Sequence, residues 1–332
     1  MASRHSWSKG GGSLKRKVLP LLALALVLAV GGFLLLGADR SKRDGPDSAQ
    51  EAPVEINGVL CRPKKNLRTF LFMGIDNTEQ HTDDYNIGGQ ADVLLLLVLD
   101  KTHGQYYQLD INRNTMTEIH SFDDDGNDIG TSVAQISYSH MQGGGGALSC
   151  ENTCRAVSDL LMGQKIDGYV ALSMYDIGKI NHVVGGVSVT IEDDFSREDP
   201  SLVMGQTIKL TDEQAEHFIR GRMSVGDGTN EGRMRRQKAY VDGMKANMLE
   251  LQKENDRYAL EVYESLQGIM DTNLTDKDFS RIARGLLSCE TQGEFGIEGT
   301  IGVDHLEQAT LEPDPDKLAD TVIDIFYHRV EQ

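Results

Sequence analysis

Basic side chains are scarce in this sequence relative to acidic ones. Its 332 residues include 33 Lys and Arg against 51 Asp and Glu, which gives a formal net charge of −18. Residues 1–45 hold eight of the basic but only two of the acidic side chains, so the rest of the chain carries −24. A surface this acidic disfavours nonspecific nucleic-acid binding. It also makes any cluster of arginines informative, because such a cluster runs against the local electrostatic field.

Cysteine is also rare, with four in the whole chain. Cys150 and Cys154 are four residues apart on a predicted helix and share a face, but a metal site would need further His or Cys ligands at matched spacing. His140 is the one candidate nearby. Core packing or disulfide pairing therefore fits these cysteines better than metal binding. An oxidising exterior permits disulfides, and the sequence leaves the pairing of all four residues open: Cys61, Cys150, Cys154 and Cys289.

Charge is absent altogether from Val18 to Gly37. This apolar run has the length of about 20 residues that a helix needs to cross a bilayer. Three basic residues, 15–17, precede it, and such a cluster normally stays in the cytoplasm. The run is too long for the apolar region of a cleaved signal peptide, and it lacks the polar face of a soluble helix. We predict an uncleaved signal-anchor in the cell membrane, with the N-terminus inside and the C-terminal domain extracellular.

The anchor divides the chain into four parts. Residues 1–17 are predicted to form a cytoplasmic tail, and residues 18–37 the transmembrane helix. Residues 38–66 are polar and, in their first half, charged and without periodicity, which is typical of a flexible extracellular stalk. Residues 67–332 are long enough to bury a large core and are assigned to one extracellular domain.

Strands and helices alternate along this domain. Phe70–Ile75 and Val93–Leu99 are apolar on both faces, as expected for central strands covered on both sides, and Gln105–Ile111 is the expected neighbour of the second. A capping box at residues 211–214 opens one helix. The alternation predicts an α/β fold in which a central β-sheet is sandwiched between helices, at residues 150–162, 175–184, 211–220, 230–254 and 318–327.

Two aspartates stand at strand ends. Asp76 ends the first predicted strand and Asp92 opens the second. If these strands are antiparallel neighbours, the two carboxylates fall side by side and form a candidate site for a hard cation. Magnesium prefers one or two carboxylates together with substrate phosphate oxygens, and manganese is the alternative. An aspartate at a strand end is also an ordinary turn residue, so the pair taken alone does not establish a metal site.

Arginines gather near two helix ends. Arg220 and Arg222 close one helix, while Arg233 and Arg236 are three residues apart in the first turns of the next, where the helix dipole favours an anion. Arg113, after the third strand, is a further candidate. Guanidinium groups match phosphate oxygens with a planar fork of donors. These five residues therefore point to a phosphate site.

Arg235 lies in the same stretch but points away from this set. A solvated helix face with local acidic partners is the alternative explanation for any of these arginines. It fits Arg235 well, because Glu231 lies four residues before it. It explains the other arginines together less well, because gathering several of them in so acidic a chain costs free energy unless an anion binds among them.

Taken in order, these stretches resemble the LytR-CpsA-Psr family of envelope phosphotransferases found mainly in Gram-positive bacteria. The similarity extends over about Leu67–Ala246, with a weaker C-terminal part, and the order, the spacing and the N-terminal anchor all agree. The matching stretches are Phe70-Leu-Phe-Met-Gly-Ile-Asp76, Ala91–Asp100, Ile111–Thr117, Ala156–Leu161, Ile180–Val189, and Leu210–Ala215 followed by Arg220-Gly-Arg222 and Gly232-Arg-Met-Arg-Arg-Gln237.

The resemblance implies a membrane-anchored transferase with a central mixed β-sheet. Such enzymes move a glycopolymer from an undecaprenyl-pyrophosphate carrier to peptidoglycan, with the prenyl chain in an apolar tunnel. By position, Asp76 and Asp92 would bind Mg²⁺ or Mn²⁺, and Asp92, Arg113 and Asn114 would form the catalytic group. The pyrophosphate would be held by Arg113, Arg220, Arg222, Arg233, Arg236 and Gln237.

Two positions depart from the family pattern. Gln90 stands where the family usually has arginine, and Arg235 is a candidate to compensate for it. Asn114 stands where the family usually has aspartate, which would act either as a general base or as a group that orients Arg113. We interpret Asn114 as the orienting group. The departures keep two alternatives open: a hydrolase of lipid pyrophosphates, and a non-catalytic or regulatory protein that binds them.

Overall fold

The computed structural model describes residues 52–76, 88–255, 258–279, 281–282, 289–305 and 307–330. The predicted cytoplasmic tail, the anchor at residues 18–37 and the first part of the stalk lie outside these residues. No helix in the described part of the chain is long and apolar enough to cross a membrane.

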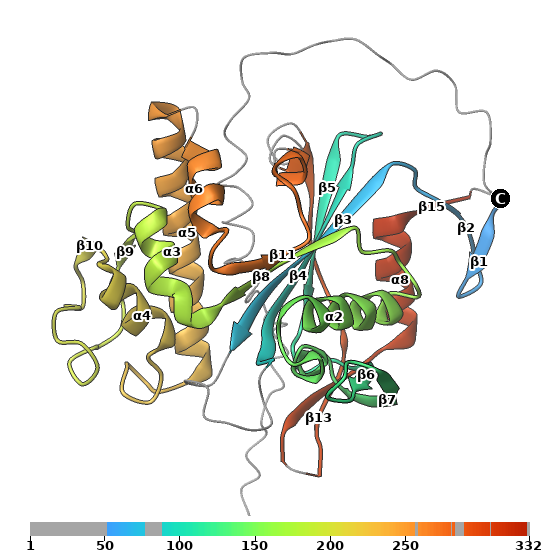
Figure 1. The fold of residues 1–332 in the computed structure, drawn as a ribbon, viewed down its shortest axis with the longest axis horizontal. Helices are drawn as coiled ribbons and strands as arrows, with labels where there is room; N and C mark the ends of the chain where they lie inside the picture. The colour runs from blue at the N-terminus through green and yellow to red at the C-terminus, as the bar shows by residue number, and fades with distance from the viewer. Residues whose placement is uncertain are drawn as a thin grey trace, which may run out of the picture.

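A six-stranded mixed sheet forms the centre of the molecule, with the strand order β11-β8-β3-β4-β5-β12 (Figure 1). β3 pairs antiparallel with β4, and β4 with β5, whereas β8 and β12 run parallel to their inner neighbours. The prediction of a central mixed sheet is confirmed, and the antiparallel pairing of β3 with β4, on which the expected meeting of Asp76 and Asp92 depended, is present. The strands are β3 (Leu67–Asp76), β4 (Gln90–Asp100), β5 (Gln105–Ile111), β8 (Gly168–Ser173), β11 (Met270–Thr272) and β12 (Glu290–Gly296).

Helices cover both faces of the sheet, as Figure 1 shows. Alternation along β3 sends Phe70 and Phe72 into one apolar core and Leu71 and Met73 into the other. The first core contains α3 (Ile177–Val183), α4 (Asp212–Arg220), α5 (Asn230–Glu254) and α6 (Tyr258–Leu266). The second contains α2 (Gly146–Leu160) and α8 (Pro315–Phe326).

The helix starts follow their capping residues. The Thr211 hydroxyl accepts from the backbone N–H of Gln214, and the Gln214 side chain accepts from the N–H of Thr211, so the predicted capping box is present. Thr229 caps α5 in a similar way, because its hydroxyl accepts from the N–H of Gly232 at 3.0 Å. Both helices that carry the arginines therefore begin at fixed points.

The folded region begins earlier than the predicted boundary at residue 67. β1 (Val54–Ile56) pairs with β2 (Val59–Pro63), and β2 pairs with the C-terminal β15 (Tyr327–Arg329). Cys61 on β2 is fully buried. Residues 38–66 are therefore not a stalk throughout. These short strands escaped prediction because the C-terminal partner that holds them is more than 250 residues away in sequence.

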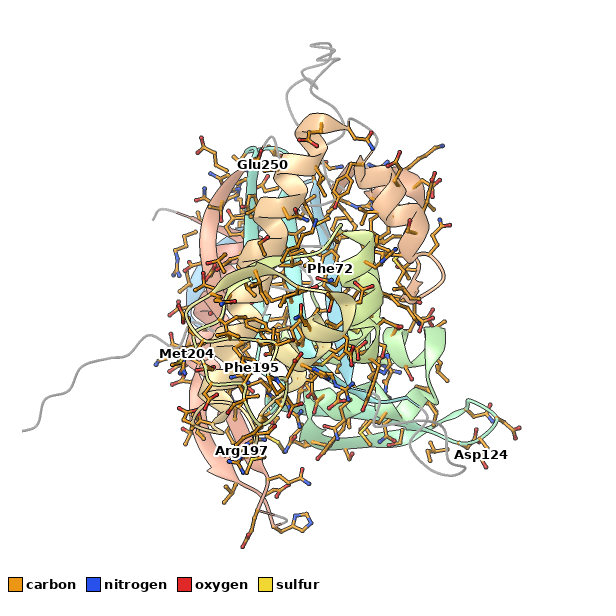
Figure 2. The ribbon with its side chains drawn as sticks, turned by 90° about the vertical axis from the view of Figure 1, so that its left-hand side faces the viewer. Phe72, Asp124, Phe195, Arg197, Met204 and Glu250 are labelled. Carbon is orange, nitrogen blue, oxygen red and sulfur yellow. The ribbon has the colours of Figure 1, made fainter. Side chains whose placement is uncertain are left out.

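Three more two-stranded ribbons occur in the described part of the chain. β9 (Ser188–Thr190) pairs with β10 (Thr207–Lys209), β6 (Met116–Phe122) with β7 (Asp128–Gln135), and β13 (Gly299–Val303) with β14 (Ala309–Pro313). In Figure 2, Asp124 at the tip of the β6–β7 hairpin projects away from the body of the molecule, whereas Phe72 and Phe195 lie in the first core.

Candidate active site

A β-bulge shapes the acidic end of the central sheet. Asp76, the last residue of β3, pairs with Gln90, the first residue of β4. The register then shifts, because Ile75 pairs with Ala91 but Gly74 pairs with Val93, so Asp92 is the extra residue. Ala91 and Leu94, three residues apart, consequently pack in the same core. The bulge leaves Asp92 beside Val93 on the face that carries α3, α4 and α5.

Asp92 lies in a desolvated and crowded position. Its side chain is 10% exposed. Burial raises the pKa of the Asp92 carboxyl, the charge and hydrogen bond of Arg113 oppose that shift, and the negative charge of Asp76 adds to it. The two aspartates are thus close enough to repel each other, as a shared cation site requires. No group of three or more His, Cys, Asp or Glu ligands occurs in the described residues, so a metal here would need oxygen ligands from substrate or water.

Arg113 reaches this acidic pair from the turn after β5. The turn is fixed locally, because the Asn112 side chain accepts from the backbone N–H of Asn114 at 2.9 Å. The Arg113 guanidinium donates through Nη1 to Asp92 Oδ1 and through Nη2 to Gln90 Oε1, the second at 3.0 Å. Gln90, which replaces a family arginine, therefore acts as an acceptor for Arg113.

Asn114 does not orient Arg113 through a side-chain hydrogen bond. Its backbone carbonyl accepts from the N–H of Leu311 at 2.8 Å, and the side-chain hydrogen bonds of Arg113 within the described residues go to Asp92 and Gln90. The interpretation of Asn114 as the orienting group is wrong in this respect. The orientation comes instead from Asp92 and Gln90 on the neighbouring strand β4.

Arg233, in the first turn of α5, lies near Asp76, Asp92 and Arg113. Burial lowers the pKa of its guanidinium, the positive charges of Arg222 and Arg113 lower it further, and Asp92 and Asp76 oppose the shift. Residues from five separate segments are therefore within electrostatic reach of one another. We call Asp76, Asp92, Arg113, Arg222 and Arg233 the charged cluster. Its three cations repel one another, so a bound anion would relieve that repulsion.

Arg220 lies beside a different partner. Its guanidinium sits over the ring of Tyr175, with 4.0 Å to the ring centroid, which is the geometry of a cation–π contact. Tyr175 belongs to η4 (Met174–Asp176), which follows β8 directly. Arg220 is exposed, so its donors remain accessible to a ligand while the stack holds its position.

Arg236 and Gln237 are buried in the protein interior. Arg236 is 4% exposed and donates through Nε to Phe218 O at 3.1 Å, through Nη1 to Asp193 Oδ2 at 2.6 Å, and through Nη2 to Gly221 O. These bonds hold its guanidinium against Asp193 and the end of α4. The phosphate-binding role expected for Arg236 does not fit this position. Gln237 is 6% exposed, and its Oε1 has no hydrogen-bond partner among the described residues.

Arg235 lies beside Asp193, outside the charged cluster. Its Nη2 lies 3.7 Å from Asp193 Oδ1, and its side chain is 56% exposed. The expected compensation for the arginine missing at Gln90 is therefore not seen, because Arg235 faces Asp193 instead. Sequence spacing alone could not reveal Asp193, which lies more than 40 residues earlier.

Arg236→Ala is expected to destabilise the fold by about 3–5 kcal/mol, because it leaves the Asp193 carboxylate and two carbonyls without their donor. Arg235→Ala should change the free energy of unfolding by less than about 1 kcal/mol, since its ion pair is exposed. Urea denaturation of the two variants measures the difference. Equal effects would contradict the assignment of Arg236 as the internal tie.

An apolar pocket lies next to the charged cluster, between the sheet and α3. Gly74 and Val93 line it beside the bulge, and Leu172, Met174 and Ile177 line it on the side of β8 and α3. Its open volume is about 30 Å³, so a long prenyl chain can enter only if the lining residues move apart. The family resemblance led us to expect an apolar tunnel, but only the structure identifies these residues.

Comparison with protein families assigns the chain. The model of the LytR_cpsA_psr family matches residues 33–298, and the protein belongs to this family. No curated protein sequence matches. Among solved structures, TagV from B. subtilis is 22% identical and covers 79% of this chain and 97% of its own, with a TM-score of 0.53.

Two further structures share the fold. Protein gbs0355 from Streptococcus agalactiae is 19% identical, covers 78% of this chain and 87% of its own, and has a TM-score of 0.57. TagT, solved bound to LI-WTA, is 16% identical, covers 79% of this chain and 90% of its own, and has a TM-score of 0.53. At these identities the similarity shows the fold alone, and function has to be argued from the site.

Proposed function

We propose that this protein transfers a glycopolymer from a polyprenyl-pyrophosphate carrier to peptidoglycan. The observation that supports it most is the position of the charged cluster beside the apolar pocket. Val93 lines the pocket and directly follows Asp92, and Gly74 lines it two residues before Asp76. A polyprenyl pyrophosphate is complementary to this arrangement, because its apolar tail matches the pocket and its pyrophosphate head matches the charged cluster.

The arginines would bind and orient the pyrophosphate. The guanidinium group of Arg113 is held by hydrogen bonds to Asp92 and Gln90. That of Arg233 is desolvated by burial, and Arg222 lies close enough to lower the pKa of the Arg233 guanidinium. Phosphoryl transfer depends mainly on positioning and on neutralising charge on the phosphate oxygens, which preorganised arginines supply. The captured structure of TagT with LI-WTA supports a lipid-linked ligand for a relative of this fold.

A divalent cation would fit at Asp76 and Asp92. Both carboxylates meet at one end of the sheet, and the negative charge of Asp76 acts on Asp92, so a cation would relieve their repulsion. Magnesium, with manganese as the alternative, would neutralise phosphate oxygens there. The chain's own part is to hold the two carboxylates and to keep Arg113 on Asp92.

A transfer assay tests the proposal. Full-length protein in detergent would be mixed with a polyprenyl-pyrophosphoryl saccharide, Mg²⁺ and peptidoglycan fragments, and saccharide attached to the acceptor would be measured. Lipid-phosphate release that needs no acceptor would instead favour the hydrolase alternative. Binding of the lipid pyrophosphate without turnover would favour a non-catalytic or regulatory protein.

Asn114→Asp separates a working enzyme from a protein that has lost its general base. Arg113 already has Asp92 and Gln90 as partners, so we expect transfer activity to rise by less than about tenfold. Restoring an essential base would raise it by about 10²–10⁴-fold. Initial rates of the two proteins with Mg²⁺ give the answer, and Asn112→Asp, in the same turn, is the matched control. A rise of several hundredfold from a near-zero rate would favour the non-catalytic alternative.

We also propose that the domain lies outside the cell, attached by the uncharged run at residues 18–37. Such a tether suits a substrate whose lipid end stays in the membrane. Protease added to intact protoplasts is expected to degrade the domain beyond residue 67 while leaving a cytoplasmic marker intact. Full protection of the domain would exclude this topology.

A further inference from the structure

A second pocket, with a polar lining, lies across the same end of the sheet. Two of its lining residues, Ile75 and Ala171, belong to the core on the α2 side, whereas the apolar pocket is lined by residues of α3. Its open volume is about 280 Å³. Ser173, at the end of β8, lines both pockets and pairs with Ile75, the residue before Asp76. The two pockets are therefore separated by the ends of β3 and β8.

The charges of the two sides differ. The charged cluster holds three arginines, whereas the polar pocket is lined by the carboxylates of Asp176 and Asp271 and by no Lys or Arg among the described residues. Lys179 pairs with Asp176 at 2.6 Å, which leaves Asp271, an exposed side chain, as the unbalanced charge. His140 adds no positive charge, because burial lowers the pKa of its ring and Nδ1 faces the carbonyls of Gly88 and Gly89.

Such a lining selects against phosphate groups and in favour of hydroxyl groups. Carboxylates repel an anionic head group but accept hydrogen bonds from sugar hydroxyls, and the Ser173 hydroxyl can donate or accept. Apolar and glycine residues, including Met270 and Gly268, make up the rest of the lining. A neutral saccharide matches this combination.

The geometry of phosphoryl transfer places the acceptor on this side. The attacking and leaving oxygens lie roughly in line through phosphorus. If the prenyl phosphate leaves on the side of the apolar pocket, the attacking hydroxyl must come from the opposite side. The polar pocket lies on that side, across the strand ends that carry Asp76.

Resting on the function proposed above, we propose that the polar pocket is the binding site for the acceptor saccharide, a neutral N-acetylated sugar with a free hydroxyl. In the transfer step that hydroxyl oxygen forms a bond to the phosphorus attached to the glycopolymer. The bond from this phosphorus to the bridging pyrophosphate oxygen breaks, prenyl monophosphate leaves, and the hydroxyl proton passes to water.

Gly268→Tyr tests the pocket with little strain on the fold. A Cβ at Gly268 would meet no heavy atom within 4 Å, so the pocket can receive a ring there. In the full-length protein, the KM for an N-acetylglucosamine oligomer should rise by about tenfold or more, the effect of losing one or two neutral hydrogen bonds. Affinity for a polyprenyl-pyrophosphoryl saccharide should be unchanged. Glu264→Tyr, on the exposed face of α6, is the control and should leave both values unchanged.

Asp271→Lys provides a second variant with an exposed side chain, and direct binding a second measurement. NMR signals of the protein should shift on addition of the N-acetylglucosamine oligomer, and both variants should weaken that binding. Unchanged oligomer binding and KM in both variants, or no oligomer binding by the wild type, would overturn the proposal. A wild type that binds the oligomer but not the lipid pyrophosphate would instead contradict the proposed function and leave the saccharide site standing.

Discussion

Arg233→Ala is expected to weaken binding of a polyprenyl pyrophosphate by roughly 10- to 150-fold, the equivalent of one charge-assisted hydrogen bond worth about 1.5–3 kcal/mol. The side chain is partly buried in the charged cluster, where burial and two neighbouring arginines lower the pKa of its guanidinium. An anion that enters this cluster pairs with a poorly solvated charge. Each contact is therefore stronger than at an exposed arginine.

Arg235→Ala is the matched control, because it removes the same side chain two residues along the same helix. That side chain is 56% exposed and lies beside Asp193. Its loss should change pyrophosphate affinity by less than about threefold, as for other exposed ion pairs. Isothermal titration with the lipid pyrophosphate measures both variants. A larger loss with Arg235→Ala than with Arg233→Ala would exclude the charged cluster as the anion site.

The sequence pattern predicted the elements whose signals are local. Two central strands were recognisable because their residues are apolar on both faces, and α4 because its capping box lies within four residues. The side-by-side position of Asp76 and the start of β4 followed from a single assumption, antiparallel pairing of β3 with β4. Short polar hairpins such as β6–β7 carry no such pattern, since most of β7 is exposed.

The finer geometry of the site depended on contacts between distant segments. Periodicity placed Arg233 and Arg236 on one face of α5, but burial separates their roles, because Asp193 and the end of α4 take the guanidinium of Arg236. The bulge at Asp92 and the contact from Gln90 to Arg113 likewise arise from strand register. Neither the bulge nor this contact has a local sequence signature. Sequence motifs alone therefore give Arg233 and Arg236 the same phosphate-binding role.

Asp92→Asn is expected to reduce transfer activity by roughly 100- to several-thousand-fold, because a metal ion at a phosphoryl group stabilises the transition state by several kcal/mol. An amide at this position carries no charge, so the Arg113 guanidinium also loses its ion pair with residue 92. Asp193→Asn is the matched control, since Asp193 also accepts from an arginine but lies outside the charged cluster. It should lower stability while leaving the dependence on Mg²⁺ intact. Full activity of Asp92→Asn, or activity without a divalent cation, would remove Asp92 from the metal site.

The pH dependence gives the same assignment an independent signature. Burial raises the pKa of Asp92 and Arg113 opposes that shift, so Arg113→Gln should raise the pKa further. A metal binds the ionised carboxylate, and Mg²⁺ affinity should therefore fall as the pH drops through this pKa. In Arg113→Gln the fall should begin at a higher pH than in the wild type. Titration of the Asp92 carboxyl by ¹³C NMR, with Mg²⁺ affinity measured at each pH, tests the sign. A fall that begins at a lower pH would mean that another group controls metal binding.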